Sequence, residues 1–478
     1  MKGDTVFMNR MKLPITDLSY LSVGLPDEVK MYHFAGDFAG EIAAIDRWLT
    51  RPVPVPDCLR KRLEIQRIFA VQMLDDYPLT RADVVEGIRR HYPAADESTL
   101  DTFIASGNVD YILKNGEMRF QHQAISNIFK THTHDLEQMF NPDYAPADPS
   151  ATAVPENIRI MQEKGSRAFR YEVEYWMKLE PHAEKPGETL KIWFPYPVAC
   201  ASQPAEEIKL LSSSHPVTVT GTVHRTAYME VPCEAGATYS VRYSFVNRAK
   251  YTALDLNRTA YPPVGDGLTP DELAYYTGEK YPHIRFTPFI RMLAREIAGN
   301  ETDPLRLAKR VYDYICAHIR YSYVRDYLLI ENIPEFVLMN GYGDCGTMAL
   351  AFITLCRALG IPAKWQSGSS CSPDSIGSHD WAMFYVAPYG WLYCDPSYGE
   401  GAARAGNEVR RNHYFGNLDP FRLVASNEFQ QPLSPDKAFC RMDPYDNQCG
   451  EAEYTDDNIF FEDREHGRRV VAWEELKM

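Results

Sequence analysis

The chain has 478 residues, of which 45% are hydrophobic and 24% charged, and its formal net charge is −15. This length exceeds what one hydrophobic core usually serves and predicts two to four domains. The acidic balance argues against a nucleic-acid backbone or an anionic membrane surface as the main partner. No apolar run in the sequence is long enough to span a bilayer, so membrane insertion is not expected.

The cysteine content indicates a reducing compartment. Ten cysteines are irregularly spaced and form neither a disulfide framework nor a CxxC zinc pattern. The first residues, MKGDTVFMNRMKLPITDLSYLS, are not followed by an apolar core of signal-peptide length. We therefore expect a cytoplasmic protein without a metal or cofactor, unless a leader has been removed from this sequence.

The first 145 residues are predicted to be mostly helical. The run CLRKRLEIQRIFAVQML places four apolar side chains roughly on one helical face, namely Leu59, Leu63, Phe69 and Leu74. Further on, VDYILKNGEMRF carries Asn-Gly between alternating apolar residues, which predicts a β-hairpin. Residues 1–145 are therefore expected to form a helical domain that includes one hairpin.

A stretch rich in proline, alanine and aspartate, NPDYAPADPSATAVPEN at 141–157, follows this region. Its composition predicts a linker, which we place at 146–160. Beyond it, apolar residues recur at every second position in FRYEVEYWMKL, TLKIWFPYPV and TYSVRYSFVNRAKY. This period predicts a β-sandwich domain over residues 161–262.

From about residue 263 a helical period returns and strands follow. DPLRLAKRVYDYICAHI carries apolar residues on one helical face, and HDWAMFYV and GWLYCDPSYG are typical of two strands joined by a turn. This order predicts an α+β domain over 263–425. Residues 426–478 are irregular, acidic and aromatic, and we expect a C-terminal extension that packs on the other domains. The predicted fold class of the chain is multidomain α+β.

The residues that bear chemistry centre on YGDCGTMALAFITLCRALGIPAKW at 342–365. Gly343 and Asp344 are expected to form a turn, after which an apolar helix begins at Cys345 and ends at Gly360. A thiol in the first turn of a helix faces unsatisfied backbone N–H groups and the positive end of the helix dipole, which favour the thiolate. The same N–H groups could stabilise an oxyanion. The alternative is that Cys345 is a small buried residue.

A thiolate nucleophile needs a base and a group that orients the base. His379 begins one of the two predicted strands, and Asp395 ends the other. If these strands form an antiparallel hairpin, the two side chains meet, and packing against the helix supplies Cys345. Taken singly, His379 could be a surface histidine and Asp395 an Asp-Pro turn residue. Their occurrence together, each at the end of an element, favours a Cys-His-Asp site.

These segments resemble the transglutaminase-like superfamily. Its core pattern is Gly-x-Cys opening a helix that ends in Arg-Ala-x-Gly-Ile-Pro-Ala-Arg, then His-x-Trp, then Trp-x-x-x-Asp-Pro. The match covers roughly residues 300–400. The resemblance implies a papain-type core in which Cys345 is the nucleophile, His379 the general base and acid, and Asp395 the residue that orients the imidazole. A β-sandwich ahead of this core also occurs in relatives.

The chain departs from the family pattern where this bears on the chemistry. Asp380 follows the histidine where a small residue is common, so it could compete with Asp395 for the imidazole. True transglutaminases also carry a tryptophan upstream of the cysteine that stabilises the oxyanion, whereas this chain has none between Trp193 and Trp365.

Other groups would have to replace that tryptophan. The candidates are Tyr321, Tyr323 and the backbone N–H of Cys345. Further candidates for the oxyanion site or the substrate cleft are Tyr342, Gly343 and Trp381, although packing explains Trp381 equally well.

The function predicted from these features is that of a thiol hydrolase, a cysteine peptidase or amidase that acts on a peptide, protein or amide substrate through an acyl-enzyme. The missing tryptophan favours hydrolysis over protein crosslinking. Transfer to an amine and cleavage of a glycan-bearing asparagine amide are alternatives within the same chemistry. An alternative of another class is a non-catalytic scaffold that keeps the fold. A further hypothesis is that the N-terminal helices bind a partner protein.

Overall fold

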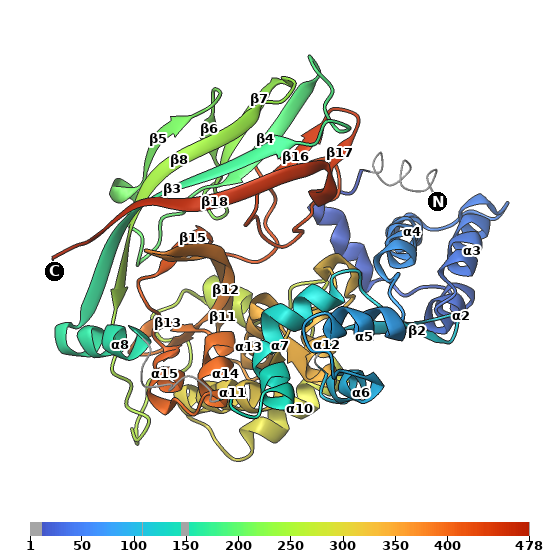
Figure 1. The fold of residues 1–478 in the computed structure, drawn as a ribbon. Coiled ribbons are helices and arrows are strands. Elements are labelled where there is room, and N and C mark those ends of the chain that lie inside the picture. Colours follow the sequence, from blue (N-terminus) through green and yellow to red (C-terminus); the bar gives the residue numbers. More distant parts are fainter. Residues whose placement is uncertain (1–11, 108, 145–152, 478) are drawn as a thin grey trace.

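The computed structural model describes residues 12–107, 109–144 and 153–477 (Figure 1). In this view a β-sandwich lies at the top, a mixed region of helices and sheet lies below it, and the first helices of the chain lie to the right. One hydrophobic cluster contains buried residues of both the N-terminal helices and the mixed region, among them Leu18, Ile65 and Val311. These two regions therefore share a core.

The N-terminal region is mostly helical, and its hairpin is where the sequence predicts it. Asn115 and Gly116 have φ angles of 52° and 79°, the left-handed backbone of a tight two-residue turn. The elements are η1 (Ile15–Ser22), α2 (Asp27–Ala35), α3 (Phe38–Thr50), α4 (Asp57–Asp76), α5 (Arg81–Arg89), α6 (Glu97–Ala105), β1 (Tyr111–Lys114), β2 (Glu117–Phe120) and α7 (Ala124–Phe140).

The expected linker at 146–160 is partly helical. Helix α8 spans Ala153–Lys164, while residues 146–152 lie outside the described residues. Ile158 and Met161, three residues apart, are both buried. This spacing places them on one helical face, which packs and makes the second half of the stretch a helix. The proline- and aspartate-rich composition of the stretch favours a linker in the sequence, although it contains this short apolar helical face.

The β-sandwich consists of two antiparallel sheets. One has the strand order β18-β3-β8-β5 and the other β17-β16-β4-β7-β6. Along β3 buried side chains alternate with more exposed ones, and Tyr171, Val173 and Tyr175 point into the core, as the period of two predicts. The strands that precede the mixed region are β3 (Ser166–Leu179), β4 (Thr189–Pro195), β5 (Lys209–Ser213), β6 (Thr218–Thr220), β7 (Thr226–Pro232) and β8 (Thr238–Lys250), with η3 (Ala205–Glu207) before β5.

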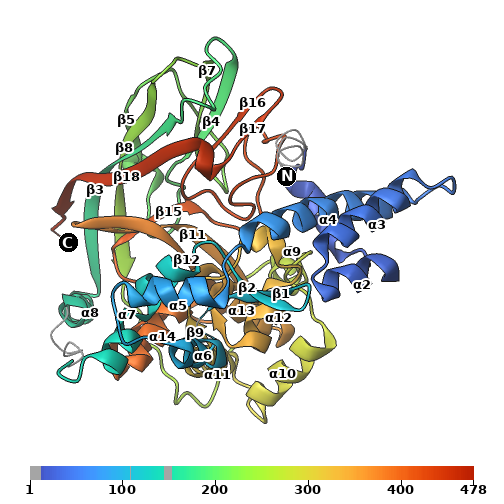
Figure 2. The same ribbon diagram turned by 45° about the vertical axis from the view of Figure 1, so that its right-hand side comes forward.

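The C-terminal residues complete the sandwich instead of forming only an irregular extension. Strand β16 (Glu451–Tyr454) pairs with β4 and with β17 (Asn458–Ile459), and after η5 (Phe461–Asp463) the long strand β18 (Arg464–Glu475) pairs with β3. Figure 2 shows β18 beside β3 along the edge of the sandwich. Most of β18 is at least partly exposed, so it lacks the apolar alternation that identifies a strand in sequence. The partner strand lies almost 300 residues earlier.

The mixed region is built on a sheet with the order β14-β13-β12-β11-β15. Its strands are β11 (Ala363–Ser372), β12 (Ser375–Val386), β13 (Gly390–Cys394), β14 (Phe415–Gly416) and β15 (Arg422–Ser426). Helix α13 (Cys345–Ala358) packs on this sheet, where Phe352 contacts Phe384 edge to face. The sheet and its helices form a mixed α+β fold, as predicted.

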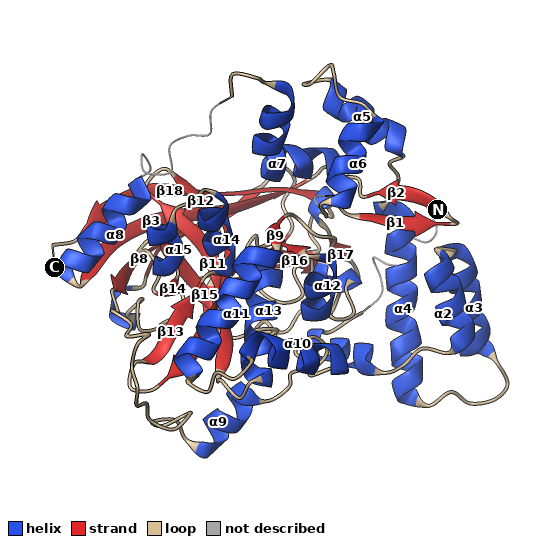
Figure 3. Ribbon diagram, turned by 90° about the horizontal axis from the view of Figure 1, so that it is seen from below, coloured by secondary structure: helices blue, strands red, loops and turns tan. Residues whose placement is uncertain are grey.

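The other helices surround α13. Figure 3 shows α10 to α13 grouped in the middle of the view from below, with α2 to α4 to one side. The remaining elements are α9 (Pro270–Thr277), α10 (Pro288–Ala298), α11 (Pro304–His318), β9 (Arg320–Tyr321), η4 (Tyr327–Leu329), α12 (Ile333–Asn340), β10 (Tyr342–Gly343), α14 (Pro396–Arg404) and α15 (Glu408–His413).

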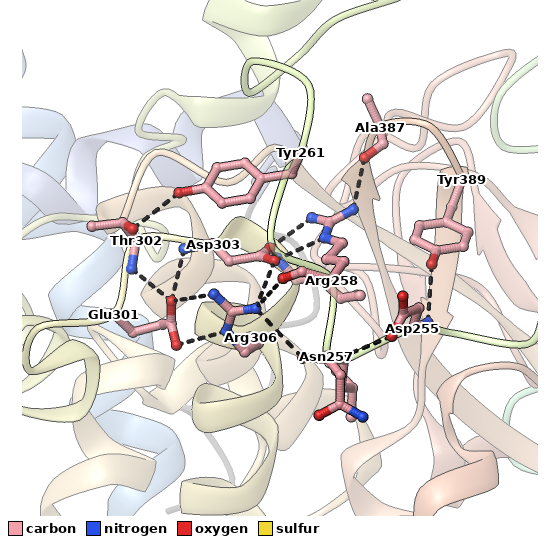
Figure 4. A network of polar contacts seen from close by, with 12 residues as sticks. Asp255, Asn257, Arg258, Tyr261, Glu301, Thr302, Asp303, Arg306, Ala387 and Tyr389 are labelled. Carbon is pink, nitrogen blue, oxygen red and sulfur yellow. Dashed lines mark hydrogen bonds and ion pairs between the residues drawn. The ribbon is translucent and has the colours of Figure 1, made fainter.

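An ion-pair network ties the segment after the sandwich to the mixed region (Figure 4). The guanidinium of Arg258 donates to both carboxylate oxygens of Asp303, at 2.8 and 2.6 Å, and to the carbonyl of Ala387 at 3.0 Å. Arg306 donates to Glu301 in the same way. Asp303 also caps α11. Since Arg258 follows β8 in sequence, the network fixes where the chain enters the mixed region.

Candidate functional site

Cys345 is the first residue of α13, as the sequence predicts. The side chain of Asp344 accepts a hydrogen bond from the backbone N–H of Thr347 at 3.0 Å, and the Thr347 hydroxyl accepts one from the N–H of Asp344 at 2.9 Å. This reciprocal capping fixes the first turn, where backbone N–H groups lack helical partners. Cys345 is half-buried as a residue, whereas the helix from Gly346 to Arg357 is buried.

His379 and Asp395 meet because β12 and β13 pair antiparallel, in register from Ala382 opposite Cys394. Nε2 of His379 lies 2.7 Å from Oδ2 of Asp395, and both side chains are buried. The Tyr398 ring stacks on the imidazole with a centroid separation of 4.5 Å. The carboxylate and the ring therefore hold the imidazole from two sides, and Nδ1 is the ring nitrogen left for another partner.

Asp395 is held as an anion. Its Oδ1 accepts hydrogen bonds from the Ser397 hydroxyl at 2.8 Å and the Tyr398 backbone N–H at 3.0 Å, and its Oδ2 lies 3.0 Å from the guanidinium of Arg422. Burial opposes ionisation, but the charges of His379 and Arg422 and these hydrogen bonds outweigh it and hold the pKa of Asp395 below its usual range. A buried carboxylate of this kind orients the imidazole and stabilises its protonated form.

Arg422 is itself fixed from two further sides. It pairs with Asp419 at 2.8 Å, and its guanidinium carbon lies 4.5 Å from the centroid of the Tyr398 ring. Arg422 begins β15, which lies on the far side of β11 from the strand of His379. The sequence reasoning missed this residue. The only signal was a charged residue at the start of the apolar run LVAS, three residues after an aspartate.

Asp380 contacts the thiol instead of the imidazole. Neighbouring residues on a strand point to opposite faces, so Asp380 faces α13 while His379 faces Asp395. Oδ2 of Asp380 lies 3.6 Å from Sγ of Cys345. The expectation that Asp380 competes with Asp395 for the imidazole is therefore wrong. Among the described residues no hydrogen bond joins Cys345 to His379.

The surroundings of Cys345 favour the thiol over the thiolate. Burial raises the pKa of Cys345 well above its ordinary value, and the carboxyl groups of Asp380 and Asp344 raise it further. The hydroxyl of Tyr327 donates a hydrogen bond to Asp344. The thiolate that the helix dipole alone would favour is thus opposed by burial and by two acidic neighbours in this arrangement.

Two of the candidate tyrosines lie beside the thiol. Tyr321 pairs with Gly343 where β9 and β10 run parallel, directly before Cys345. Burial raises the pKa of Tyr321, and Cys345 and Asp344 raise it further when they are ionised. The Tyr323 ring is 6.3 Å from the Tyr321 ring, and this side chain is 38% exposed. Both rings therefore border the N-terminal end of α13, where Cys345 lies.

The other predicted cleft residues pack in the interior. The Tyr342 hydroxyl donates to Asp110 of the N-terminal region at 3.2 Å, and the Trp381 indole N–H donates to Gln366 at 2.7 Å, with both rings buried. At Gly343 a Cβ would lie 2.5 Å from the Thr347 hydroxyl. In this structure Tyr342, Gly343 and Trp381 are therefore buried and support the site through packing.

The described residues contain no cluster of three or more His, Cys, Asp or Glu side chains that could hold a metal ion. Within the same residues no helix is long and apolar enough to cross a bilayer.

The chain is similar to known proteins over this region. Residues 291–396 match the family model of the transglutaminase-like superfamily. An uncharacterized protein of Haemophilus influenzae is 27% identical in an alignment 141 residues long. The alignment covers 24% of this chain and 37% of that relative, little more than a third of the relative's length.

Two solved structures are similar at low sequence identity. One is titled a "putative cysteine protease" from Cytophaga hutchinsonii, with 13% identity, a TM-score of 0.42 and coverage of 66% of this chain and 92% of that one. The other is the periplasmic domain of TgpA from Pseudomonas aeruginosa, with 17% identity, a TM-score of 0.25 and coverage of 53% and 95%.

Proposed function

Because residues 291–396 form a transglutaminase-like core, we propose that this protein is a thiol hydrolase that cleaves a peptide or amide bond. Cys345 is the nucleophile, His379 the general base and acid, and Asp395 the residue that orients the imidazole. The observation that carries the proposal is the buried contact of 2.7 Å between His379 and Asp395, reinforced by Arg422. The residue after His379, Asp380, lies 3.6 Å from Sγ of Cys345.

The proposed mechanism assigns each step to one of these groups. Nδ1 of His379 takes the proton of Cys345, and Sγ attacks the substrate carbonyl carbon. Backbone N–H groups in the first turn of α13 stabilise the resulting oxyanion. Tyr321 and Tyr323 border this end of the helix. The imidazolium then protonates the leaving amine and an acyl-enzyme forms. Water, deprotonated by His379, releases the acid and restores the thiol.

Asp395 acts throughout without changing its protonation state. Its charge offsets the positive charge that develops on His379 when the thiol is deprotonated, and its contact with Nε2 fixes which ring nitrogen is available. Arg422 keeps Asp395 ionised. Amine transfer shares every step up to the acyl-enzyme, and hydrolysis is preferred because the chain lacks the upstream tryptophan of the crosslinking enzymes.

A non-catalytic scaffold is the second candidate, and one observation favours it. The thiol contacts the carboxyl of Asp380, and burial together with acidic neighbours raises its pKa. A protein that only binds has no need of a reactive thiolate. The two candidates differ in whether Cys345 is required for turnover.

The test compares hydrolysis by wild type, Cys345→Ala and Cys356→Ala. Cys356 is the matched control because it lies on the same helix, is fully buried and takes no part in the proposed chemistry. The substrates are a fluorogenic peptide-amide library and denatured casein, with a dansylated primary amine added in parallel to detect transfer. We expect hydrolysis by wild type and Cys356→Ala and none by Cys345→Ala. Turnover that survives in Cys345→Ala would refute the proposal.

A further inference from the structure

The carboxyl of Asp380 occupies a space that the sequence keeps open at the start of α13. Residue 346 is glycine, and a Cβ there would lie 2.8 Å from Oδ2 of Asp380 and 2.5 Å from the hydroxyl of Tyr327. The missing side chain therefore lets Asp380 reach Sγ of Cys345 at 3.6 Å. Gly346 and Asp380 are thus parts of one close-packed arrangement around the thiol.

A residue from far along the chain fixes the orientation of this carboxyl. Nε2 of Gln448 donates to Oδ1 of Asp380 at 2.6 Å and to the backbone carbonyl of His379 at 3.2 Å. With Oδ1 engaged, Oδ2 is the oxygen that faces the sulfur. Gln448 belongs to the irregular segment 427–450 between β15 and β16, which we call the cover segment, and its side chain is buried.

The cover segment is held at Gln448 by a residue of the sandwich and is also stabilised by a contact within itself. Arg468 of β18 donates to the carbonyl of Gln448 at 2.6 Å and to the hydroxyl of Ser378 at 2.7 Å. Arg441 donates to the carbonyl of Asp446. The position of Gln448, and with it that of Asp380, is therefore set by the sandwich as well as by the mixed region.

The groups that face Asp380 are mostly acidic. They include Cys345 at the start of α13, Asp344 that caps this helix, the hydroxyl of Tyr327, and Asp443 and Asp446 from the cover segment. Burial raises the pKa of Asp380 to about 8, and the charges of Asp443 and Asp344 contribute to the rise. Burial also raises the pKa of Asp446 well above its usual range, with Asp443 and Asp380 adding to the effect. Asp380 and Asp446 thus compete with the thiol for protons in a poorly solvated space.

We propose that Asp380 is a positioning residue that keeps Cys345 in its protonated form in this arrangement, and that Gln448 of the cover segment holds it there. This inference rests on the proposed function, because it concerns the activation of the same thiol. While the S–H group of Cys345 faces Oδ2 of Asp380, its proton does not point to Nδ1 of His379. The nucleophile becomes competent when Gln448 releases Asp380 and the thiol turns to the imidazole.

The experiment measures the pH dependence of iodoacetamide alkylation of the full-length protein, mapped to each cysteine by mass spectrometry. The variants are Asp380→Asn, which keeps the shape and removes the charge, and Gln448→Ala. Gln431→Ala is the matched control, since Gln431 also lies in the cover segment, and within the part of the chain that the structure describes its side chain hydrogen-bonds only the carbonyl of Phe429. Thermal unfolding of each variant shows whether it is folded.

We expect the alkylation midpoint of Cys345 to fall by about one pH unit or more in Asp380→Asn, because a neighbouring acidic group is removed. Gln448→Ala should shift it in the same direction by less, and Gln431→Ala should leave it unchanged. A midpoint in folded Asp380→Asn that is unchanged or higher overturns the inference. Should Asp380→Asn fail to fold, an unchanged midpoint in Gln448→Ala has the same consequence.

Failure here is distinguishable from failure of the proposed function. If Asp380→Asn lowers the midpoint but no substrate is hydrolysed in a manner that depends on Cys345, the positioning role stands and the hydrolase proposal falls. If hydrolysis depends on Cys345 but the midpoint does not move, the positioning role alone falls.

Discussion

At the scale of single residues, Asp395 is the most constrained group of the site. It accepts hydrogen bonds from Ser397 and Tyr398 and pairs with both His379 and Arg422. Replacing it by asparagine keeps the shape but removes the charge that orients the imidazole in the proposed mechanism. We expect Asp395→Asn to lower the hydrolytic rate by about 10²- to 10⁴-fold.

The control for this variant is Ser397→Ala, which removes a single hydrogen bond to Oδ1 and leaves both charged partners in place. Its hydrolytic rate should fall by much less than that of Asp395→Asn. Steady-state kinetics with a substrate found in the library screen would measure both. Equal losses in the two variants would show that the charge of Asp395 is not what matters.

The raised pKa of Asp380 predicts an effect on stability as well as on reactivity. An unfolded chain ionises this carboxyl near pH 3.9, whereas the folded protein holds its pKa at about 8. Between these values the folded state retains a proton that the unfolded state has lost, so the contribution of Asp380 to folding is present at low pH and is lost as the pH rises. Asparagine has no such dependence.

The free energy of unfolding of Asp380→Asn, relative to wild type, should therefore increase as the pH is raised from about 5 to about 8. Urea unfolding at several pH values measures this difference. The control is Asp374→Asn in the exposed turn between β11 and β12, for which we expect the difference from wild type to stay constant. A flat difference for Asp380→Asn as well would contradict the raised pKa.

At the scale of elements, the first turn of α13 must both begin a helix and leave room for side chains that pack closely against it. The Asp344 cap and the apolar positions make a helix that begins at Cys345, while Gly346 is required by the close approach of Tyr327, Trp365 and Asp380. An alanine at 346 raises intrinsic helix propensity but places its Cβ within 3.0 Å of these side chains. We expect the steric conflict to dominate.

Gly346→Ala should destabilise the protein by about 1–3 kcal/mol. Gly401→Ala is the matched comparison, because Gly401 lies inside α14 and a Cβ there meets nothing within 4 Å. That variant should be stabilised by about 0.5–1 kcal/mol. Chemical denaturation of both variants gives the comparison. Similar effects of the two would mean that the packing around Gly346 is looser than described.

At the scale of the whole molecule, the sandwich and the site are coupled through β18. Arg468 reaches from this strand to Gln448 and Ser378, whereas its neighbour Arg469 points outward, is 70% exposed and pairs with Glu174. The contacts of Arg468 join a strand of the sandwich to Gln448, 20 residues away in sequence, and to Ser378 of the mixed region, 90 residues away. Those of Arg469 remain within one sheet.

We expect Arg468→Ala to accelerate amide hydrogen exchange in the cover segment around Gln448 and to cost about 1–3 kcal/mol of stability. Arg469→Ala, which removes only a surface ion pair, should change stability by less than about 1 kcal/mol and leave that exchange unchanged. Hydrogen exchange followed by mass spectrometry provides both readings. Equal exchange in the two variants would show that Arg468 does not anchor the cover segment.

The sequence by itself determined what depends on neighbours in the chain. The start of α13 at Cys345 follows from a local turn and cap, the hairpin at 111–120 from Asn-Gly, and the alternation of β3 from a period of two. The meeting of His379 with Asp395 also follows locally, because one hairpin joins their strands.

Only the tertiary structure decided the features that depend on distant partners. The pairing of β18 with β3, the guanidinium of Arg422 beside Asp395, and the contact of Gln448 with Asp380 join residues that no local pattern relates. Polar side chains such as Arg422 and Gln448 carry no periodic signal in the sequence. Their burial and their partners decide their role, and packing sets both. For the same reason the sequence favoured a thiolate at Cys345, while the packed surroundings favour the thiol.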